Sequence, residues 1–139
     1  MACKEGKQVD WDRLKQKIDA GADFVLTQLF YSNYDFFEFY DYLTSKLKVS
    51  VPICPGILPI LSGSQIKRFT QMCGSKLPAE LITKVESFGD NDDAASAFGI
   101  EYATRQCEAL LKAGVPGLHF YTLNKVRSTT QVLKNLGLA

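Results

Sequence analysis

Three short apolar runs, separated by segments with helical periodicity, constrain the fold of this chain more than any other feature. The runs cover residues 24–30, 52–58 and 118–123, and turn-forming residues flank them. The first run is apolar on both faces, which is typical of a parallel strand that helices cover on both sides. Strands that alternate with helices form parallel βαβ units with right-handed crossovers. We therefore expect an α/β fold.

The segments between these runs have the periodicity and end signals of helices. Apolar side chains recur at helical spacing, which gathers them on one face of each helix. Asp10 is expected to cap the first helix, because its carboxylate can accept hydrogen bonds from first-turn amides. Gly21 suits the end of that helix, where a left-handed residue is common. The other helices are predicted to begin near residues 32, 62, 78, 90 and 125.

The length of the chain limits how much of a barrel it can form. Its 139 residues suit a single domain, residues 1–139, with one hydrophobic core. A complete eight-stranded βα barrel needs about 250 residues. The sequence also lacks a glycine-rich phosphate loop, which disfavours a dinucleotide-binding fold. Three predicted strands are therefore too few for a complete (βα)8 TIM barrel and would make up only part of one.

Composition excludes several classes of function. Sixteen basic residues against fifteen acidic ones argue against a nucleic-acid partner bound through bulk charge. No apolar run approaches the roughly 18 residues of a membrane helix, and no secretory signal is visible. Four widely spaced cysteines and one histidine favour free thiols over disulfides or a metal site. We expect a cytoplasmic protein without a metal, a membrane or a nucleic acid as partner.

Polar residues follow the apolar residues of the first and third predicted strands. Gln28 and Tyr121 stand near the carboxyl ends of these strands, where parallel βα folds bind their ligands. A buried glutamine needs hydrogen-bond partners, which a pterin or flavin ring or the protein core itself can supply. We expect both side chains to point from neighbouring strands into a shared mouth that accepts a flat heterocycle.

Other candidate residues have structural explanations of equal weight. Gln65 and Phe69 lie one turn apart on a predicted helix, where Phe69 either packs in the core or stacks on an aromatic ligand. Lys125 follows the third strand and meets either an anionic substrate tail or solvent. Lys17 is near a helix end, where a cation complements the helix dipole. No nucleophile motif or carboxylate pair is present, so we predict no catalytic residue.

Three segments of the chain resemble methylenetetrahydrofolate reductase. The first is residues 17–24 (KIDAGADF), which lead into residues 26–31 (LTQLFY). The second is residues 55–60 (PGILPI), and the third is residues 117–124 (GLHFYTLN). They occur in the order and at the spacing of that family, and the resemblance covers residues 9–139.

The resemblance implies a flavin-dependent (βα)8 barrel. In this family NADH or NADPH reduces bound FAD. The reduced flavin then passes a hydride to 5,10-methylenetetrahydrofolate, which gives 5-methyltetrahydrofolate for methionine synthesis. The resemblance implies that this chain is the C-terminal part of the catalytic barrel, with the last three βα units and extra helices.

Several residues match functional positions of the family. By this resemblance, Asp10 and Lys17 contact FAD, with Lys17 near the pyrophosphate and Asp10 near a ribose or amide group. Gln28 matches a glutamine that binds the folate pterin and faces the nicotinamide.

The remaining matches concern the folate substrate. Gln65 and Phe69 match residues that hold the aminobenzoate portion or the stacked nicotinamide. Tyr121 matches a strand-end tyrosine near the bound ligands. Lys125 stands where the family commonly has arginine. Lysine keeps the positive charge but cannot bind a carboxylate with the two parallel hydrogen bonds of an arginine.

One family segment has no counterpart here. The catalytic glutamate of the family lies in a Phe-Glu-Phe-Phe-Pro-Pro type segment, which this sequence does not contain. We therefore expect a chain that is inactive alone and needs an N-terminal half-barrel or a second copy as partner. The alternatives are a non-catalytic half-barrel that binds folate or another protein, and an unrelated βα-barrel enzyme.

Overall fold

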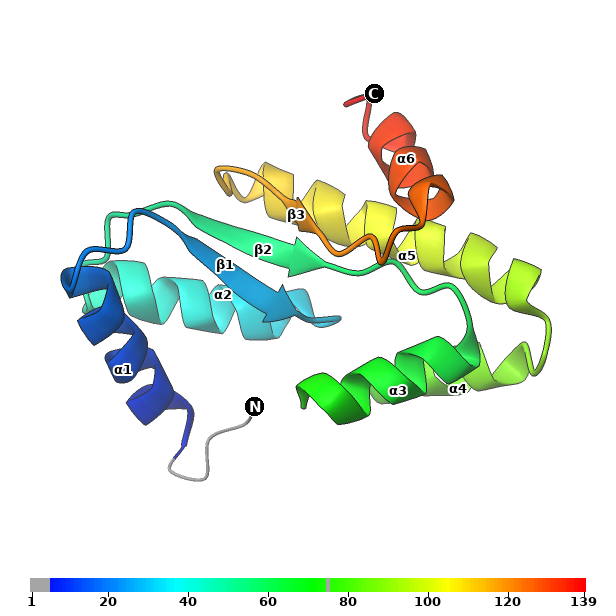
Figure 1. Cartoon of the computed structure of the whole chain (residues 1–139), viewed down its shortest axis with the longest axis horizontal. Coiled ribbons are helices and arrows are strands. Elements are labelled where there is room, and N and C mark those ends of the chain that lie inside the picture. Colours follow the sequence, from blue (N-terminus) through cyan, green and yellow to red (C-terminus); the bar gives the residue numbers. More distant parts are fainter. Residues whose placement is uncertain (1–5, 75) are drawn as a thin grey trace.

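The sheet has three parallel strands, which is the arrangement that the alternating sequence pattern predicts. The computed structural model describes residues 6–74 and 76–139, and the side chains of residues 69, 70 and 73 fall outside that description. The strands are β1 (Val25–Leu29), β2 (Ile53–Ile57) and β3 (His119–Phe120), and they lie in the order β1-β2-β3 (Figure 1). The α/β class is confirmed, and the sheet is consistent with part of a barrel.

The helices follow the predicted order along the chain. They are α1 (Lys7–Asp19), α2 (Asn33–Asp41), α3 (Gly63–Cys73), α4 (Ala79–Ser87), α5 (Asp92–Lys112) and α6 (Val126–Asn135). The helix α2 continues into a short π-helical turn, η1 (Tyr42–Lys46), which the sequence did not predict. No helix within residues 6–74 and 76–139 is long and apolar enough to cross a membrane.

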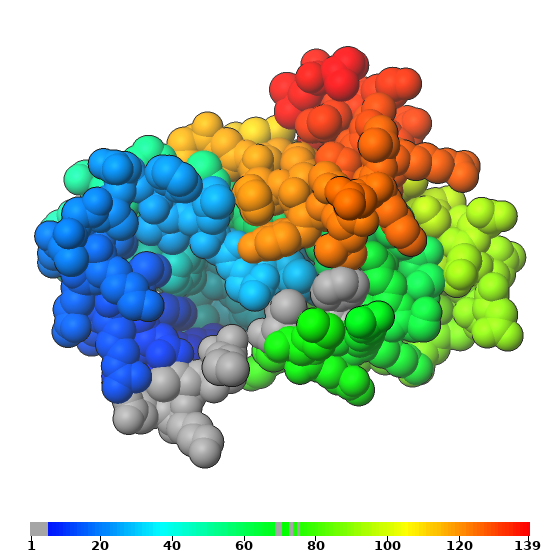
Figure 2. All heavy atoms as spheres, viewed as in Figure 1, coloured from blue at the N-terminus to red at the C-terminus, as the bar shows by residue number. Residues whose placement is uncertain are grey.

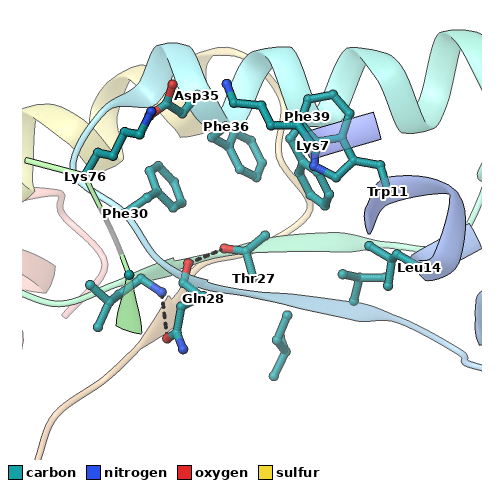
Figure 3. Close-up of a pocket in the computed structure, with 14 residues that line it drawn as sticks. Lys7, Trp11, Leu14, Thr27, Gln28, Phe30, Asp35, Phe36, Phe39 and Lys76 are labelled. Atoms are coloured by element: carbon teal, nitrogen blue, oxygen red, sulfur yellow. Dashed lines mark hydrogen bonds between the residues drawn. The ribbon is translucent and has the colours of Figure 1, made fainter. Parts of the chain in front are cut away.

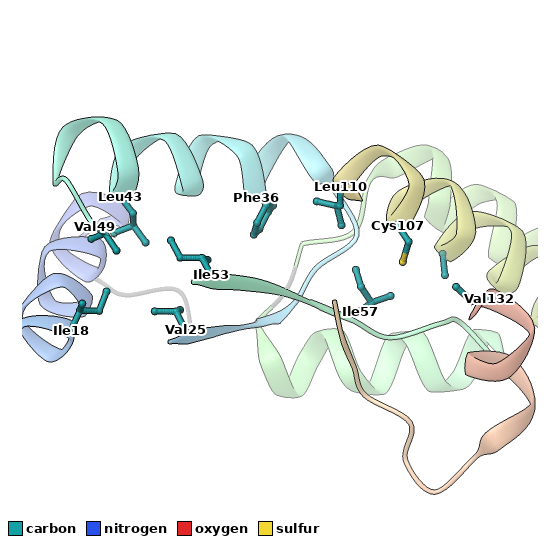
Figure 4. Close-up of a cluster of buried hydrophobic side chains, with 11 residues drawn as sticks. Ile18, Val25, Phe36, Leu43, Val49, Ile53, Ile57, Cys107, Leu110 and Val132 are labelled. Atoms are coloured by element: carbon teal, nitrogen blue, oxygen red, sulfur yellow. The ribbon is translucent and has the colours of Figure 1, made fainter. Parts of the chain in front are cut away.

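The main hydrophobic core lies on the side of the sheet that α2 and α5 cover. Figure 4 shows both helices on one side of β1 and β2, with the buried side chains between. Leu43, Ile53, Ile57 and Leu110 are almost completely buried there. Burial of each such side chain contributes about 1.5–3 kcal/mol, so this side stabilises the sheet.

A second cluster lies beyond the carboxyl ends of β1 and β2. Leu29 and Leu58 contact apolar side chains from α3 and α4, including Ile66, Leu81 and Val85. Figure 1 shows these two helices side by side, at the end of the molecule toward which β1 and β2 point. The helices α3 and α4 therefore cover part of the carboxyl ends of β1 and β2.

The other side of the sheet is less covered, and we call it the open side. It carries Leu26, Gln28, Gly56 and Tyr121. Leu26 is 45% exposed, and Phe24, just before β1, is 58% exposed. Figure 2 shows the light-blue atoms of β1 at the surface, between α1 and the orange segment around β3. The prediction that helices cover both faces of the first strand is therefore wrong for this chain.

Two predicted boundaries are also wrong. The helix α1 begins at Lys7 after Gly6, which has a φ of 99°, so Asp10 lies within the first turn instead of capping it. The carboxylate still lies near the positive end of the helix dipole.

The third strand ends earlier than predicted. Leu123 and Asn124 have φ values of 50° and 60°, and the Lys125 amide donates to the Thr122 oxygen at 2.8 Å. These features define a tight turn, which ends the extended conformation after Phe120.

Candidate functional site

Gln28 lies at the carboxyl end of β1 and is exposed on the open side of the sheet. Figure 3 shows its side chain pointing away from the aromatic side chains of α2. Its Oε1 atom accepts a hydrogen bond from the Leu29 amide at 3.0 Å. Gln28 is therefore not a core glutamine, and its side chain is exposed on the open side.

Tyr121 reaches β1 from the far side of β2. Its backbone amide donates to the Ile57 oxygen at 2.8 Å, and its hydroxyl donates to the Thr27 oxygen at 3.0 Å. The strand β2 lies between β1 and β3, so the prediction that Gln28 and Tyr121 come from neighbouring strands is wrong. The tyrosine side chain crosses β2 and ends at the residue before Gln28.

Gly56 makes this crossing possible, and sequence reasoning missed it. A Cβ atom at this position would lie 2.8 Å from Cε2 of Tyr121 and 2.5 Å from the Thr27 oxygen. Such distances exclude any side chain without a shift of the neighbouring atoms. The Pro55-Gly56 pair inside an apolar run was the available signal, because glycine in a strand often marks a close approach.

Gln65 has a structural role at the start of α3. Its backbone amide donates to Oγ of the N-cap Ser62 at 3.2 Å, and its Oε1 accepts from the Leu61 amide at 2.7 Å. This arrangement is close to a capping box. The Nε2 amide of Gln65 is the part that can still donate to a ligand. Phe69 lies one turn further along α3, but its side chain lies outside the described part of the structure.

Lys125 is exposed at the N-cap position of α6. It lines a hollow of about 270 Å³, together with Arg127, Ser62 and two acidic residues at the start of α5, Asp92 and Asp93. The hollow brings Lys125 close to the N-terminus of α3, where Gln65 lies.

Asp10 and Lys17 lie on α1, apart from the other candidates. They are seven residues apart, which puts them on the same side of the helix at about 10 Å along its axis. Lys17 is exposed and Asp10 is half-buried. The neighbouring Lys15 pairs with Asp19 at 2.5 Å.

An aromatic hollow of about 440 Å³ lies between α1, α2 and β1. Trp11, Phe36 and Phe39 line its helical side, and Figure 3 shows them above β1 with Phe30. The rings of Phe30 and Phe36 stack with centroids 5.3 Å apart. The hollow borders the edge of β1 that has no partner strand among the described residues.

The buried thiol of Cys107 is not a reactive group. Burial, with a smaller effect of the Glu108 charge, raises the pKa of the Cys107 thiol to about 12. The thiol therefore stays protonated at neutral pH. Within residues 6–74 and 76–139, no three His, Cys, Asp or Glu side chains form a cluster that could bind a metal ion.

Comparison with known proteins finds similarity over nearly the whole chain. The sequence profile described as methylenetetrahydrofolate reductase matches residues 3–137. The chain belongs to the methylenetetrahydrofolate reductase family. Similar relatives include methylenetetrahydrofolate reductase (NADH) 1 of Arabidopsis thaliana, with 42% identity over 138 residues, and a probable methylenetetrahydrofolate reductase (NADPH) of Caenorhabditis elegans, with 37% identity over 126 residues. The 5,10-methylenetetrahydrofolate reductase of Escherichia coli is 32% identical over 131 residues.

The chain spans only part of these family members. The alignments cover 99%, 90% and 94% of this chain, but only 23%, 19% and 44% of the three relatives. A solved structure from Clostridium thermocellum, described as binding two copies of 5-methyl-5,6,7,8-tetrahydrofolic acid, has a related fold. It matches with a TM-score of 0.56 and 20% identity, over 93% of this chain and 47% of that protein.

Proposed function

We propose that this chain is the C-terminal part of the catalytic barrel of an FAD-dependent methylenetetrahydrofolate reductase. The complete enzyme would use NADH or NADPH to reduce 5,10-methylenetetrahydrofolate to 5-methyltetrahydrofolate. Family membership and the NADH and NADPH names of the relatives support this proposal. The structural observation that carries it is the contact between the Tyr121 side chain and β1 next to Gln28, on the open side of the sheet.

The open side suits one face of a flat heterocycle. The Nε2 amide of Gln28 would donate to an acceptor on the pterin or nicotinamide ring, and Tyr121 would flank the ring. Gln65 and Phe69 would contact the aminobenzoate portion, and Lys125 would meet a carboxylate of the substrate tail. The folate ligand of the Clostridium thermocellum protein, which shares the fold, supports a folate as substrate.

The residues on α1 fit part of an FAD molecule. Lys17 is exposed and can meet the pyrophosphate, and Asp10 can accept a hydrogen bond from a ribose hydroxyl about two helical turns away. A cation and a carboxylate on one side of a helix suit these two portions of the cofactor. Bound FAD would supply the hydride carrier, while this chain would supply binding contacts.

A partner is part of the proposal. Phe24 and Leu26 are exposed, and β1 has no second neighbour among the described residues. We propose that an N-terminal half-barrel, or a second copy of this chain, pairs with the outer edge of β1 and encloses the open side together with the ligand. Because the sequence has no Phe-Glu-Phe-Phe-Pro-Pro type segment, we expect no turnover by the chain alone.

Calorimetric titration with 5-methyltetrahydrofolate tests the proposal. We expect the wild-type chain to bind and the Gln28→Ala variant to bind about tenfold more weakly, because one hydrogen bond is lost. Gln131→Ala is the matched control, since this exposed glutamine lies on α6 and donates to Asn135. A wild-type chain that does not bind, or equal affinities of the two variants, would contradict the proposal.

An assay of hydride transfer tests the absence of turnover. The homogeneous chain is supplied with FAD, NADH and the folate substrate, and no turnover is expected. Robust turnover would show that the chain needs no further catalytic segment.

A non-catalytic half-barrel is the second candidate function. The exposed Phe24 and Leu26 favour it, because apolar residues at an open sheet edge promote association. Size-exclusion chromatography with light scattering distinguishes a monomer from an assembly. Flavin absorbance in the purified assembly would favour a completed flavin-binding barrel over an interaction module.

A further inference from the structure

The pairing between β1 and β2 contains a bulge next to Gln28. Val25 pairs with Ile53 and Leu26 with Cys54, but the next pair joins Leu29 to Gly56. The step from Leu26 to Leu29 is three residues, whereas the step from Cys54 to Gly56 is two. The strand β1 therefore carries one extra residue at Thr27 and Gln28, and a bulge of this kind redirects a side chain.

The Thr27 hydroxyl closes the bulge. It accepts a hydrogen bond from the Gly56 amide at 2.9 Å and donates to the Gln28 oxygen at 2.9 Å. In a regular parallel ladder, a backbone carbonyl would accept from the Gly56 amide. Since Gly56 is buried, its amide needs an acceptor, and the hydroxyl replaces the missing carbonyl.

Tyr121 fixes the same residue from the other direction. Its hydroxyl donates to the Thr27 oxygen, and its backbone amide is anchored to β2 through Ile57. The imidazole of His119 packs edge-on against the Tyr121 ring, with centroids 4.9 Å apart. Both the hydroxyl and the carbonyl of Thr27 are therefore engaged, while the Gln28 side chain is exposed.

We propose that Thr27 is a positioning residue, which fixes the direction of the Gln28 amide through its bonds to Gly56 and Tyr121. Thr27 itself needs no contact with the ligand. The ligand-binding consequence rests on the proposed function, whereas the positioning of Gln28 is a property of the free chain. The two parts can therefore be tested separately.

Nuclear magnetic resonance of the ¹⁵N-labelled chain tests the positioning in the absence of ligand. In Thr27→Val, which keeps the shape but loses the hydroxyl, we expect the Gly56 amide to exchange with solvent about tenfold faster. We also expect the Gln28 side-chain amide signals to move toward those of a free glutamine. Thr27→Ser should restore both signals, because it keeps the hydroxyl. Tyr121→Phe, which removes only the bond to the Thr27 oxygen, should move the Gln28 signals in the same direction by less.

Thr83→Val is the matched control. This residue loses a hydroxyl bond to Ala79 within α4, away from the bulge. The control should leave the Gly56 and Gln28 signals unchanged. The proposal is wrong if Thr27→Val and Tyr121→Phe both leave these signals at their wild-type positions.

A double-mutant cycle tests the consequence for binding. Thr27→Val should weaken binding of 5-methyltetrahydrofolate about tenfold, but should have no further effect in a Gln28→Ala background, because it acts through Gln28. An equal loss in both backgrounds would overturn the positioning role. A wild-type chain that binds no folate would contradict the proposed function, and the resonance measurements would still decide the role of Thr27.

Discussion

The two sides of the sheet use the same three strands but differ in what covers them. On the side of α2 and α5, Ile53, Ile57 and Leu110 are almost completely buried. On the open side, Leu26 and Gln28 are exposed. Neighbouring residues of a strand alternate between the two sides, so a single strand contributes to both.

This difference separates stability from binding. The covered side contains the large apolar cluster, whereas the open side contains the bulge and the exposed amide of Gln28. Substitutions on the covered side should lower the free energy of unfolding. Substitutions of the exposed side chains on the open side, such as Gln28, should mainly change what the sheet can bind.

The largest expected effect comes from a matched pair of leucines. Leu110→Ala should lower the free energy of unfolding by about 3 kcal/mol, because a fully buried side chain leaves a cavity. Leu26→Ala should lower it by less than about 1 kcal/mol, since Leu26 is already 45% exposed. Urea denaturation measures both. Similar losses of unfolding free energy in the two variants would contradict the difference in stability between the covered side and the open side.

Gly56→Ala should have the next largest effect. The new methyl group would lie 2.5 Å from the Thr27 oxygen and 2.8 Å from the Tyr121 ring, so the backbone of β1 must shift. We expect a loss of about 2 kcal/mol in thermal unfolding, together with altered Gln28 signals. In Gly63→Ala, the control, the methyl group would meet Val85 at an ordinary 3.5 Å. If the control is as damaging as Gly56→Ala, the close approach at Gly56 is not the cause.

A smaller effect is expected from pH on the covered side. The ordinary thiol pKa is near 9.0, and burial raises that of Cys107 to about 12. Between these values the unfolded chain releases a proton that the folded chain keeps, so the free energy of unfolding should fall as pH rises. Cys107→Ala should make this fall shallower without abolishing it, because burial also raises the pKa of Tyr102.

Denaturation curves from pH 7 to pH 12 measure this slope. Below the ordinary thiol pKa, the two proteins should show the same dependence on pH. An identical slope above it in wild type and variant would mean that Cys107 ionises equally in both states.

The smallest expected effect on stability is at Lys17. This side chain is exposed, so Lys17→Ala should change the free energy of unfolding by less than about 0.5 kcal/mol. The affinity of the Lys17→Ala variant for FAD, measured by flavin fluorescence, should nevertheless be lower than that of the wild-type chain. Lys15→Ala, which breaks the pair with Asp19, is the control and should leave flavin affinity unchanged. Equal flavin affinities of the wild type, Lys17→Ala and Lys15→Ala would show that Lys17 does not contact the cofactor.

The order of the elements could be predicted because its signals are local. Apolar periodicity, Ser62 as a helix cap and the glycines at helix ends depend on neighbouring residues only. The capping role of Gln65 was also visible, because Ser62 and Gln65 have the spacing of a capping box. Sequence reasoning treated Gln65 as a ligand contact and missed this role.

The bulge could not be predicted, because it depends on how two strands pair. Nothing in residues 25–29 alone shows that Thr27 must accept from Gly56 on the next strand. The early end of β3 depends on the positive φ values of Leu123 and Asn124. Asparagine adopts such values more often than most residues, but leucine rarely does. The resemblance supplied the candidate residues, and the structure adds the contact that joins Tyr121 to the strand of Gln28.

A resonance map of the ¹⁵N-labelled chain during titration with 5-methyltetrahydrofolate tests directly whether the open side of the sheet binds the folate. We expect the shifted signals to gather on the open side, at Gln28, Gly56 and Tyr121, while the signals of α2 and α5 stay in place. Shifts confined to α2 and α5, or no shifts at a saturating excess of the ligand, would contradict this expectation.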